Sequence, residues 1–294
     1  MNDPKKIFWL ASYPKSGNTL MRAILSSLFF SLKGKYSNEL LDWIESFETC
    51  ARLKFIEEEN PKDIKKISDL KILSKYWKEM QSEKRFNIKE SFCFIKTHSA
   101  LTNIFGNKFT NEKLTRGLIY IVRDPRDILL SWSKHRNKSI DDTLDFMLNI
   151  DSTIAYNDIH FLKDQNLRPL QYVSSWNAHV NSWQNLDVPK MIIRFEDLIE
   201  KKQEIIKKII NFFNIEYEIS INNIEEKTQN ILKTTDFNFM KKLEEKFGFK
   251  EALNHTKFFN IGKKNQWKKN LSALHAQDIE KSFAETMKKF GYLN

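Results

Sequence analysis

The chain has 294 residues, of which 41% are hydrophobic, 13% aromatic and 29% charged. This composition excludes an intrinsically disordered protein and suits one large α/β domain over residues 1–294. The formal net charge of +10 favours anionic ligands, although charge alone does not distinguish nucleic acid, anionic lipid and phosphorylated small molecules.

Targeting, anchoring and metal-binding segments are not expected. The most apolar stretch, residues 23–30, is far shorter than the roughly 20 residues that span a bilayer. The first residues run into an apolar segment without the pattern of a secretory signal. Two distant cysteines, Cys50 and Cys93, support neither a disulfide framework nor a zinc site. We therefore predict a cytoplasmic protein without a membrane span and without a metal.

Four short apolar runs predict buried strands with helices between them. They are rich in β-branched and aromatic residues and cover residues 7–12, 92–95, 118–122 and 191–195. A parallel sheet flanked by helices on both faces is the α/β fold that this alternation predicts. Charged helical patterns between the first two strands predict a helical insertion at about residues 36–88.

Further helices are predicted later in the chain. Asp124 followed by Pro125 is typical of a helix start, because the carboxylate caps the helix and proline fits its first position. Helical spacing of apolar residues predicts three more helices, over residues 170–183, 203–213 and 273–290. Residues 248–266 have no sustained period and predict a loop.

A polar loop joins the first strand to the first helix. It is rich in groups that bind an anion: Lys15, Ser16, Gly17, Asn18 and Thr19. A helix N-terminus presents unpaired N–H groups to an anion, and the lysine and the hydroxyls add charge and donors. The pattern therefore predicts a phosphate-binding strand, loop and helix. It differs from a strict nucleotide-triphosphate loop, in which the lysine follows the second glycine.

This loop resembles the Tyr-Pro-Lys-Ser-Gly-Thr-Thr loop of the PAPS-dependent sulfotransferases, from which only Asn18 departs. PAPS is 3′-phosphoadenosine 5′-phosphosulfate, the sulfuryl donor of that family. Residues 121–131 resemble the family's segment for the donor's 3′-phosphate, and the resemblance implies this role for Arg123 and Ser131. An arginine can pair with two phosphate oxygens while a hydroxyl binds a third.

The second predicted strand ends in Lys96-Thr97-His98, similar to the Lys-x-His context of the family's general base. An acceptor hydroxyl is a poor nucleophile at neutral pH until a positioned base takes its proton. We predict His98 as that base and Lys15 as the cation at the leaving oxygen. Lys96 has two open alternatives: it neutralises the sulfuryl oxygens or it faces solvent.

Residues 258–268 partly resemble the family's C-terminal donor loop, Arg-Lys-Gly-x-x-Gly-x-Trp. Two positions of that pattern align, Gly262 and Trp267. Three positions depart from it: Asn260, Ile261 and Asn265. The resemblance leaves Lys263 and Lys264 as candidates for the missing cations.

Two weaker similarities concern the same donor. Thr235, Phe237 and Met240 resemble a family stretch that frames the adenine. Residues 195–198 resemble the Tyr-Glu-Asp segment after the family's fourth strand, with Phe195 lacking the phenolic oxygen.

The resemblance implies an enzyme that moves a sulfuryl group from PAPS to a hydroxyl or amine of a small-molecule or glycan acceptor and releases PAP. Two alternatives stay open. A P-loop-type kinase is expected to have the strict lysine-after-glycine loop and a magnesium-binding acid. A non-catalytic anion- or nucleic-acid-binding protein is expected to gather basic and aromatic residues on one face. The sequence spreads its lysines among acids, so no nucleic-acid partner is predicted, and it leaves acceptor and oligomeric state open.

Overall fold

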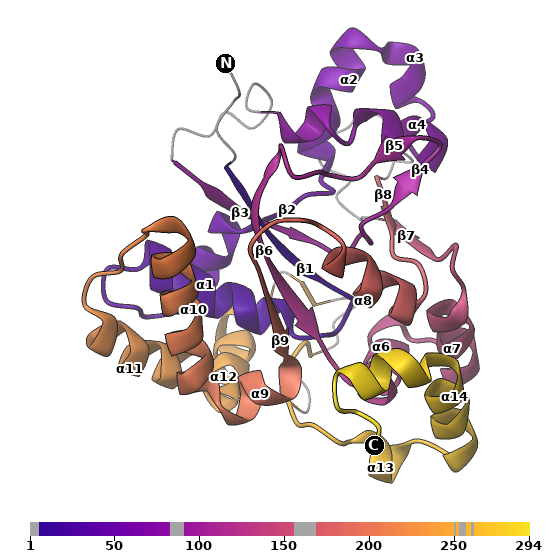
Figure 1. Cartoon of the computed structure of the whole chain (residues 1–294). Helices are drawn as coiled ribbons and strands as arrows, with labels where there is room; N and C mark the ends of the chain where they lie inside the picture. The colour runs from indigo at the N-terminus through magenta and orange to yellow at the C-terminus, as the bar shows by residue number, and fades with distance from the viewer. Residues whose placement is uncertain (1–5, 83–90, 156–168, 250, 253–256, 260–261) are drawn as a thin grey trace. The chain divides into compact units, whose positions relative to one another are not determined.

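The structure is a computed structural model that describes residues 6–82, 91–155, 169–249, 251–252, 257–259 and 262–294. Strands and helices are mixed along the chain up to β9, after which the described elements are all helices (Figure 1). The chain divides into two compact units. Unit 1 consists of Met1–Tyr13, Glu45–Tyr120 and Met147–Lys190. Unit 2 consists of Pro14–Ile44, Ile121–Phe146 and Met191–Asn294.

A five-stranded sheet has the order β2-β3-β1-β6-β9. Its strands are β1 (Ile7–Ser12), β2 (Glu45–Ser46), β3 (Cys93–Thr97), β6 (Thr115–Val122) and β9 (Lys190–Arg194). Strand β3 pairs in parallel with β1 and with β2, with Ile7 opposite Cys93 and Glu45 opposite Ile95. The predicted α/β class with a parallel sheet is therefore confirmed. All four apolar runs contain strands, within three residues of the predicted ends.

Unit 1 packs around large aromatic side chains. The rings of Trp9, Phe47 and Phe109 lie 5.2–5.4 Å apart, and those of Trp77 and Trp183 contact Phe109. All five side chains are buried, so this cluster, which includes Trp9 of β1, forms a core of unit 1.

Short elements make up most of the region predicted as a helical insertion. They are η1 (Asn38–Trp43), η2 (Cys50–Leu53), α2 (Lys54–Glu59), α3 (Pro61–Ile64), α4 (Leu70–Tyr76) and η3 (Glu79–Gln81). Strand β2 interrupts them, because its backbone pairs with β3. A strand of two residues is too short to show a sequence period, which is why the sequence did not predict it.

The rest of unit 1 holds two short hairpins and a helix. The elements are β4 (Asn103–Ile104), β5 (Asn107–Lys108), β7 (Thr153–Ala155), β8 (Leu170–Tyr172) and α8 (Trp176–Gln184). The predicted helix over residues 170–183 is wrong over residues 170–175, because α8 begins only at Trp176. Residues 170–172 form β8 instead, since they pair antiparallel with β7.

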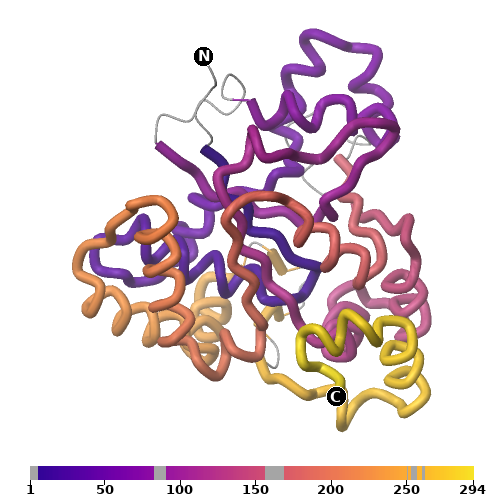
Figure 2. The backbone as a smooth tube through the Cα atoms, viewed as in Figure 1, coloured from indigo at the N-terminus to yellow at the C-terminus, as the bar shows by residue number. Residues whose placement is uncertain are grey.

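Unit 2 is mainly helical. It contains α1 (Asn18–Phe30), α6 (Pro125–Arg136), α9 (Phe195–Glu200), α10 (Lys202–Tyr217), α11 (Ile224–Thr234), α12 (Phe237–Phe247), α13 (Trp267–Asn270) and α14 (Ala273–Lys289), while α7 (Ile140–Leu148) begins in it. Helix α11 packs against α1, α10 and α12, and the tube in Figure 2 shows these helices side by side. The predicted start of α6 is confirmed: Pro125 is its first residue and the Asp124 carboxylate accepts the Arg126 N–H at 3.0 Å.

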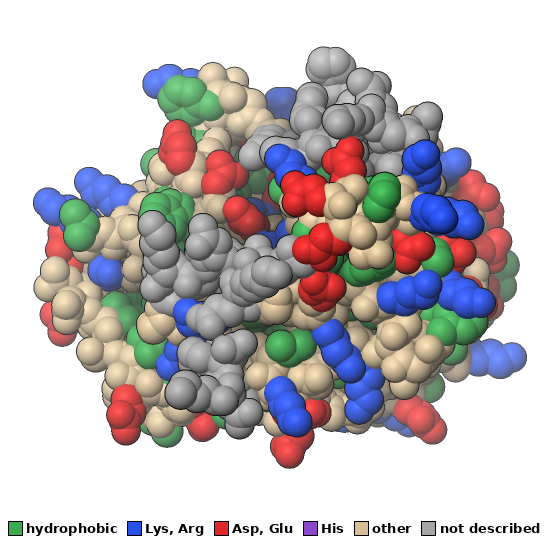
Figure 3. Space-filling view, turned by 90° about the horizontal axis from the view of Figure 1, so that it is seen from above, with side chains coloured by type: hydrophobic (Ala, Val, Ile, Leu, Met, Phe, Trp, Pro, Cys, Tyr) green, Lys and Arg blue, Asp and Glu red, His purple; other side chains and the backbone are tan. Residues whose placement is uncertain are grey.

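Charged side chains of both signs are interspersed on the face drawn in Figure 3. Among the described residues, no helix is long and apolar enough to cross a bilayer. Nor does the described part of the chain hold a group of three or more His, Cys, Asp or Glu side chains suited to a metal.

Candidate active site

The turn between β1 and α1 depends on two residues with left-handed backbone conformation. Lys15 has φ +65° and Gly17 has φ +100°. A Cβ atom added to Gly17 would lie 2.4 Å from the ring of Phe195. Both the conformation and the closeness of that ring therefore require glycine. The 13-residue helix α1 begins directly after this turn, and its first N–H groups have no intrahelical partners.

Two hydroxyl side chains of this region differ in their hydrogen bonding: Ser16 has no described partner, whereas Thr19 bonds to Glu251. Ser16 is fully buried, and its hydroxyl has no hydrogen-bond partner among the described residues. Leaving such a group unpaired costs about 1–3 kcal/mol, so a ligand that bonds to it gains affinity. The Thr19 hydroxyl donates to the Glu251 carboxylate at 2.8 Å. The same carboxylate pairs with the buried Arg22.

Arg123 joins this turn through its own side chain. One guanidinium nitrogen donates to the Lys15 carbonyl oxygen at 2.9 Å, and the guanidinium carbon lies 4.3 Å from the centre of the Phe195 ring. Burial lowers the pKa of Arg123, while the nearby Asp127 carboxylate, 3.9 Å away, opposes that shift. The Arg123 Nε is buried and unpaired within the described residues. Phe195 thus packs against both Gly17 and Arg123.

Helix α6 carries Ser131 and anchors the C-terminal loop. Ser131 is half-buried in the second turn of the helix. The Asp127 carboxylate accepts the N–H groups of Asn265 at 2.8 Å and of Trp267 at 2.9 Å. Burial raises the pKa of Asp127, and Arg123 lowers it. The guanidinium of Arg126 lies 3.7 Å from the centre of the Trp267 ring.

Asn265, which replaces the second glycine of the family's C-terminal loop, keeps the backbone conformation that a glycine would adopt there. Gly262 has φ +59° and Asn265 has φ +57°, so both positions that are glycine in the family adopt the left-handed region. Asparagine tolerates that region better than most residues. A Cβ atom on Gly262 would lie 2.2 Å from the Phe237 ring, so these two predicted donor residues contact each other. Asn260 and Ile261 lie outside the described residues.

The other predicted donor residues are less directly involved. The Thr235 hydroxyl donates to the Ile231 carbonyl oxygen at 2.8 Å, as expected for a residue at a helix end. Lys263 is exposed. Lys264 is paired with Glu200, which neutralises part of its charge.

Unit 1 contributes the predicted base. The Nδ1 atom of His98 lies 2.7 Å from the Ser12 carbonyl oxygen. A carbonyl only accepts, so Nδ1 carries the hydrogen and the lone pair of the neutral ring is on Nε2. The His98 carbonyl oxygen accepts the Nε2–H group of His179 at 3.0 Å.

His179 is itself fixed and neutral. Its Nδ1 accepts the Tyr120 hydroxyl at 2.8 Å, and the ring is fully buried. Burial lowers the pKa of His179 to about 4. The backbone at His98 is therefore held by an uncharged network of buried side chains.

Lys96 lies on β3 with a half-buried side chain. Its positive charge lowers the pKa of the buried Glu48, against a larger rise from burial. Both predicted roles of Lys96 stay open.

The predicted residues therefore fall into two groups. The donor residues all belong to unit 2, and His98 and Lys96 belong to unit 1. Sequence reasoning missed three contributors in unit 2: Phe195, Asp127 and Glu251. Phe195 and Asp127 had a signal, because each lies in a segment that resembles the family, whereas Glu251 acts through contacts with residues distant in sequence and had none.

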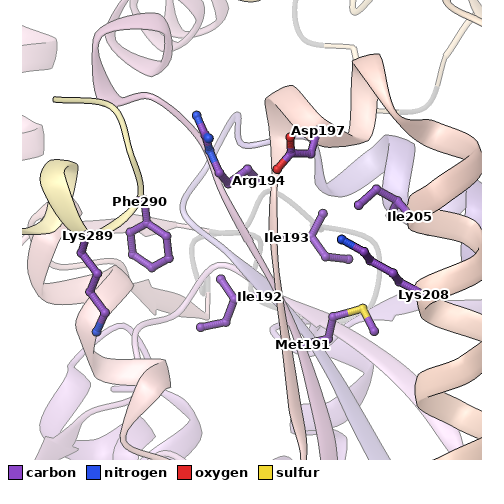
Figure 4. A pocket seen from close by; sticks show the side chains of 9 residues that line it. All are labelled: Met191, Ile192, Ile193, Arg194, Asp197, Ile205, Lys208, Lys289 and Phe290. Atoms are coloured by element: carbon purple, nitrogen blue, oxygen red, sulfur yellow. The ribbon is translucent and has the colours of Figure 1, made fainter. Parts of the chain in front are cut away.

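A pocket of about 280 Å³ surrounds the edge of β9 between α10 and α14 (Figure 4). Its apolar wall includes Ile192 and Phe290, and three cations border it: Arg194, Lys208 and Lys289. None of the predicted donor residues is among its lining residues. Of these three cations, only Arg194 lies on the edge strand itself, where a basic side chain commonly prevents pairing with other strands, while Lys208 and Lys289 lie on α10 and α14.

Known proteins resemble the chain over most of its length. The family model described as "Sulfotransferase domain" matches residues 5–291. The chain is 23% identical over 234 residues to luciferin sulfotransferase of Photinus pyralis, a match that covers 79% of this chain and 56% of that protein. The chain thus spans little more than half the length of this curated relative.

Two solved structures share the fold. A mouse sulfotransferase (SULT7A1) complexed with PAP has a TM-score of 0.58 and 17% identity, covering 98% of this chain and 85% of that chain. Retinol dehydratase in complex with retinol and PAP has a TM-score of 0.59 and 18% identity, covering 97% and 82%. At these identities, the similarity establishes the fold alone.

Proposed function

Because the chain belongs to the sulfotransferase domain family, we propose that it transfers a sulfuryl group from PAPS to an acceptor and releases PAP. The observation that carries the proposal is the hydrogen bond from Arg123 to the Lys15 carbonyl, which joins the two segments expected to hold the two anionic ends of one nucleotide. PAP is bound in the mouse sulfotransferase and in retinol dehydratase, which supports the same donor here. The family match over residues 5–291 also supports a single sulfotransferase domain over residues 1–294.

The donor is held by unit 2. The phosphosulfate lies at the N-terminus of α1, where the N–H groups and hydroxyls from Ser16 to Thr19 bind its oxygens. The 3′-phosphate binds Arg123 and Ser131, whose α6 helix is tied to the C-terminal loop through Asp127. The adenine lies near Thr235 and Phe237, beside Gly262. Lys263 and Lys264 add positive charge at that end.

The reaction is an in-line displacement at sulfur. The bond from sulfur to the bridging phosphate oxygen breaks while a bond from sulfur to the acceptor oxygen or nitrogen forms. Charge grows on the leaving phosphate, and Lys15 stabilises it, as fixed cations do in phosphoryl transfer. His98 takes the acceptor's proton on Nε2, and its Nδ1–H bond to Ser12 keeps the ring in the tautomer that accepts there.

The acceptor is proposed to be a small molecule with a hydroxyl or an amine. Retinol dehydratase has been crystallised with retinol and with androsterone, both small alcohols, which supports this class over a glycan. The residues that bind the acceptor are expected among the elements inserted at about residues 36–88 and in the loop at residues 248–266.

Binding calorimetry with PAP, ATP and a random oligonucleotide tests the donor. We expect PAP to bind tightest, by tenfold or more over ATP, since the 3′-phosphate adds a charge-assisted contact of about 1.5–3 kcal/mol. Tighter binding of ATP would favour the kinase, and tighter binding of the oligonucleotide would favour a nucleic-acid-binding protein. Incubation with labelled PAPS and a panel of small alcohols, phenols and amines then identifies the acceptor.

A further inference from the structure

An acidic side chain that the proposed mechanism does not use lies beside the predicted base. Glu48 follows β2 and is 1% exposed. Its neighbour Phe47 donates its N–H to the Lys96 carbonyl oxygen at 2.8 Å, which places this part of the chain alongside the end of β3. His98 is the second residue after Lys96, so the backbone pairing brings Glu48 next to the turn that carries the base.

The Glu48 carboxyl group holds both neighbours of His98. Its Oε1 atom accepts the Thr97 hydroxyl at 2.6 Å and the Ser99 hydroxyl at 2.5 Å, and both hydroxyl residues are buried. The Ser99 N–H group donates to the Thr97 hydroxyl oxygen at 2.9 Å. A hydroxyl has one hydrogen, and directing it to Glu48 leaves the Thr97 lone pairs to the Ser99 N–H. The carboxyl group thus closes a turn whose central residue is His98.

A buried acid is a costly way to achieve packing alone. Burial raises the pKa of Glu48, and its second oxygen has no hydrogen-bond partner among the residues described. An apolar side chain of similar volume avoids that penalty. An ionised carboxylate accepts both hydroxyl groups on one oxygen. Unlike an amide or a hydroxyl side chain, it carries no hydrogen that competes for other partners.

We propose that Glu48 is a positioning residue for His98. It acts through Thr97 and Ser99 and fixes the direction of the His98 ring, so that Nδ1 bonds to Ser12 and Nε2 is presented to the acceptor. This proposal rests on the proposed function, in which His98 is the base. A purely structural Glu48 predicts that its removal lowers stability without a specific effect on the chemical step.

Steady-state kinetics and PAP calorimetry test the proposal with three variants. Glu48→Ala is expected to lower kcat about tenfold or more, because small displacements of a catalytic group have effects of this size, and to change the PAP Kd less than about twofold. Glu48→Gln keeps an oxygen that accepts both hydroxyls and is expected to keep kcat within about threefold. Glu45→Ala is the matched control, since Glu45 lies three residues before Glu48, on β2, is exposed and pairs with Arg52. A Glu48→Ala enzyme with the kcat of the Glu45→Ala enzyme overturns the proposal.

A double-mutant comparison tests whether Glu48 acts on His98 through the hydroxyl groups of Thr97 and Ser99. The double variant Thr97→Val/Ser99→Ala removes both hydroxyls and is expected to lower kcat as Glu48→Ala does. Adding Glu48→Ala to it should then cause no further loss, because one interaction has been removed in two ways. Fully additive losses overturn the proposal. If Glu48→Ala does not fold, the kcat of Thr97→Val/Ser99→Ala decides: an unchanged value overturns the proposal, and a tenfold loss supports it.

A spectroscopic measurement separates this proposal from the proposed function. Nitrogen chemical shifts of the isotope-labelled His98 ring report which nitrogen carries the hydrogen. We expect the Nδ1–H tautomer in the wild type, Glu48→Gln and Glu45→Ala, and a mixture in Glu48→Ala. A single unchanged tautomer in Glu48→Ala overturns the positioning role. If the wild type transfers no sulfuryl group to any acceptor, the proposed function fails, yet the tautomer comparison still decides the role of Glu48.

Discussion

Arg123 in unit 2 and His98 in unit 1 are held by different kinds of contact: charged and aromatic groups surround Arg123, whereas uncharged hydrogen-bonding groups hold His98. Arg123 lies among charges and an aromatic face, with Asp127 at 3.9 Å and the Phe195 ring at 4.3 Å. His98 is held by a backbone carbonyl and by the neutral ring of His179. A donor with several negative charges is bound by fixed cations, whereas a base must keep one tautomer and one direction. Changes in the two regions should therefore affect different measurements.

The largest effect is expected from the base. His98→Ala should lower kcat roughly a hundredfold or more, because a general base contributes at least that much to a proton transfer. The PAP Kd should stay within about twofold, since the residues proposed to bind the donor belong to unit 2. Steady-state kinetics at saturating PAPS and calorimetry measure the two quantities. His275→Ala is the control, because His275 pairs with Asp141 in unit 2. Near-normal turnover in His98→Ala would contradict the assignment of His98 as the base and of the chemical step to its region.

The reverse pattern is expected from Arg123. Arg123→Ala should weaken PAP binding about tenfold to a hundredfold, the size of a charge-assisted phosphate contact. Arg123→Lys keeps the charge but not the forked geometry, so its affinity for PAP should lie between those of the wild type and Arg123→Ala. Because the guanidinium is buried, the loss of affinity in Arg123→Ala should persist at high salt concentration. The control is Arg116→Ala, which removes a hydrogen bond to the Ser91 carbonyl in unit 1. Equal affinities of Arg123→Ala and the wild type would contradict the assignment.

Low pH should reduce the contribution of the buried His179 ring to the free energy of unfolding. The pKa of His179 is about 4 in the folded protein and 6.5 as a free side chain, so the neutral ring contributes stability above pH 6.5. That contribution is lost as the pH falls from 6.5 towards 4, by about 1.4 kcal/mol for each pH unit, or about 2 kcal/mol at pH 5. Urea unfolding at pH 7.5 and pH 5 should show a smaller difference for His179→Gln than for the wild type. Equal differences would mean that the His179 ring takes up no proton on unfolding.

The fold was largely predictable because its central strands are buried. Strand β1 and the second half of β6 are continuous apolar runs, whereas β3 and the edge strand β9 contain shorter ones. Strand β2 was not predictable, since two residues show no period and exist as a strand only through pairing with β3. The same holds for β8, whose residues have a helical pattern but pair with β7.

The candidate site was predictable where neighbouring residues create it. The turn at Gly17 and the start of α6 at Asp124 follow from local conformation and capping. The contacts of Phe195 with Gly17 and of Asp127 with the C-terminal loop connect residues far apart in sequence. No local pattern marks such a pair, so only the structure reveals them.

The smallest effects are expected from the two lysines of the C-terminal loop, and they test how far the charged region extends. Lys263 is exposed, whereas Lys264 is paired with Glu200. Lys263→Ala should weaken PAP binding about twofold to fivefold, the size of an exposed charge pair. Lys264→Ala should weaken it less, because Glu200 already offsets that charge.

Glu200→Ala sharpens the same test, since it releases Lys264 from its partner and should tighten PAP binding by up to a few-fold. Calorimetry at low salt measures all three variants against the wild type. Because exposed charges are screened by salt, each difference should shrink at high ionic strength, unlike the loss in Arg123→Ala, whose guanidinium is buried. Unchanged affinity in a Lys263→Ala/Lys264→Ala double variant would remove both lysines from the donor site and confine the charged region to Lys15 and Arg123.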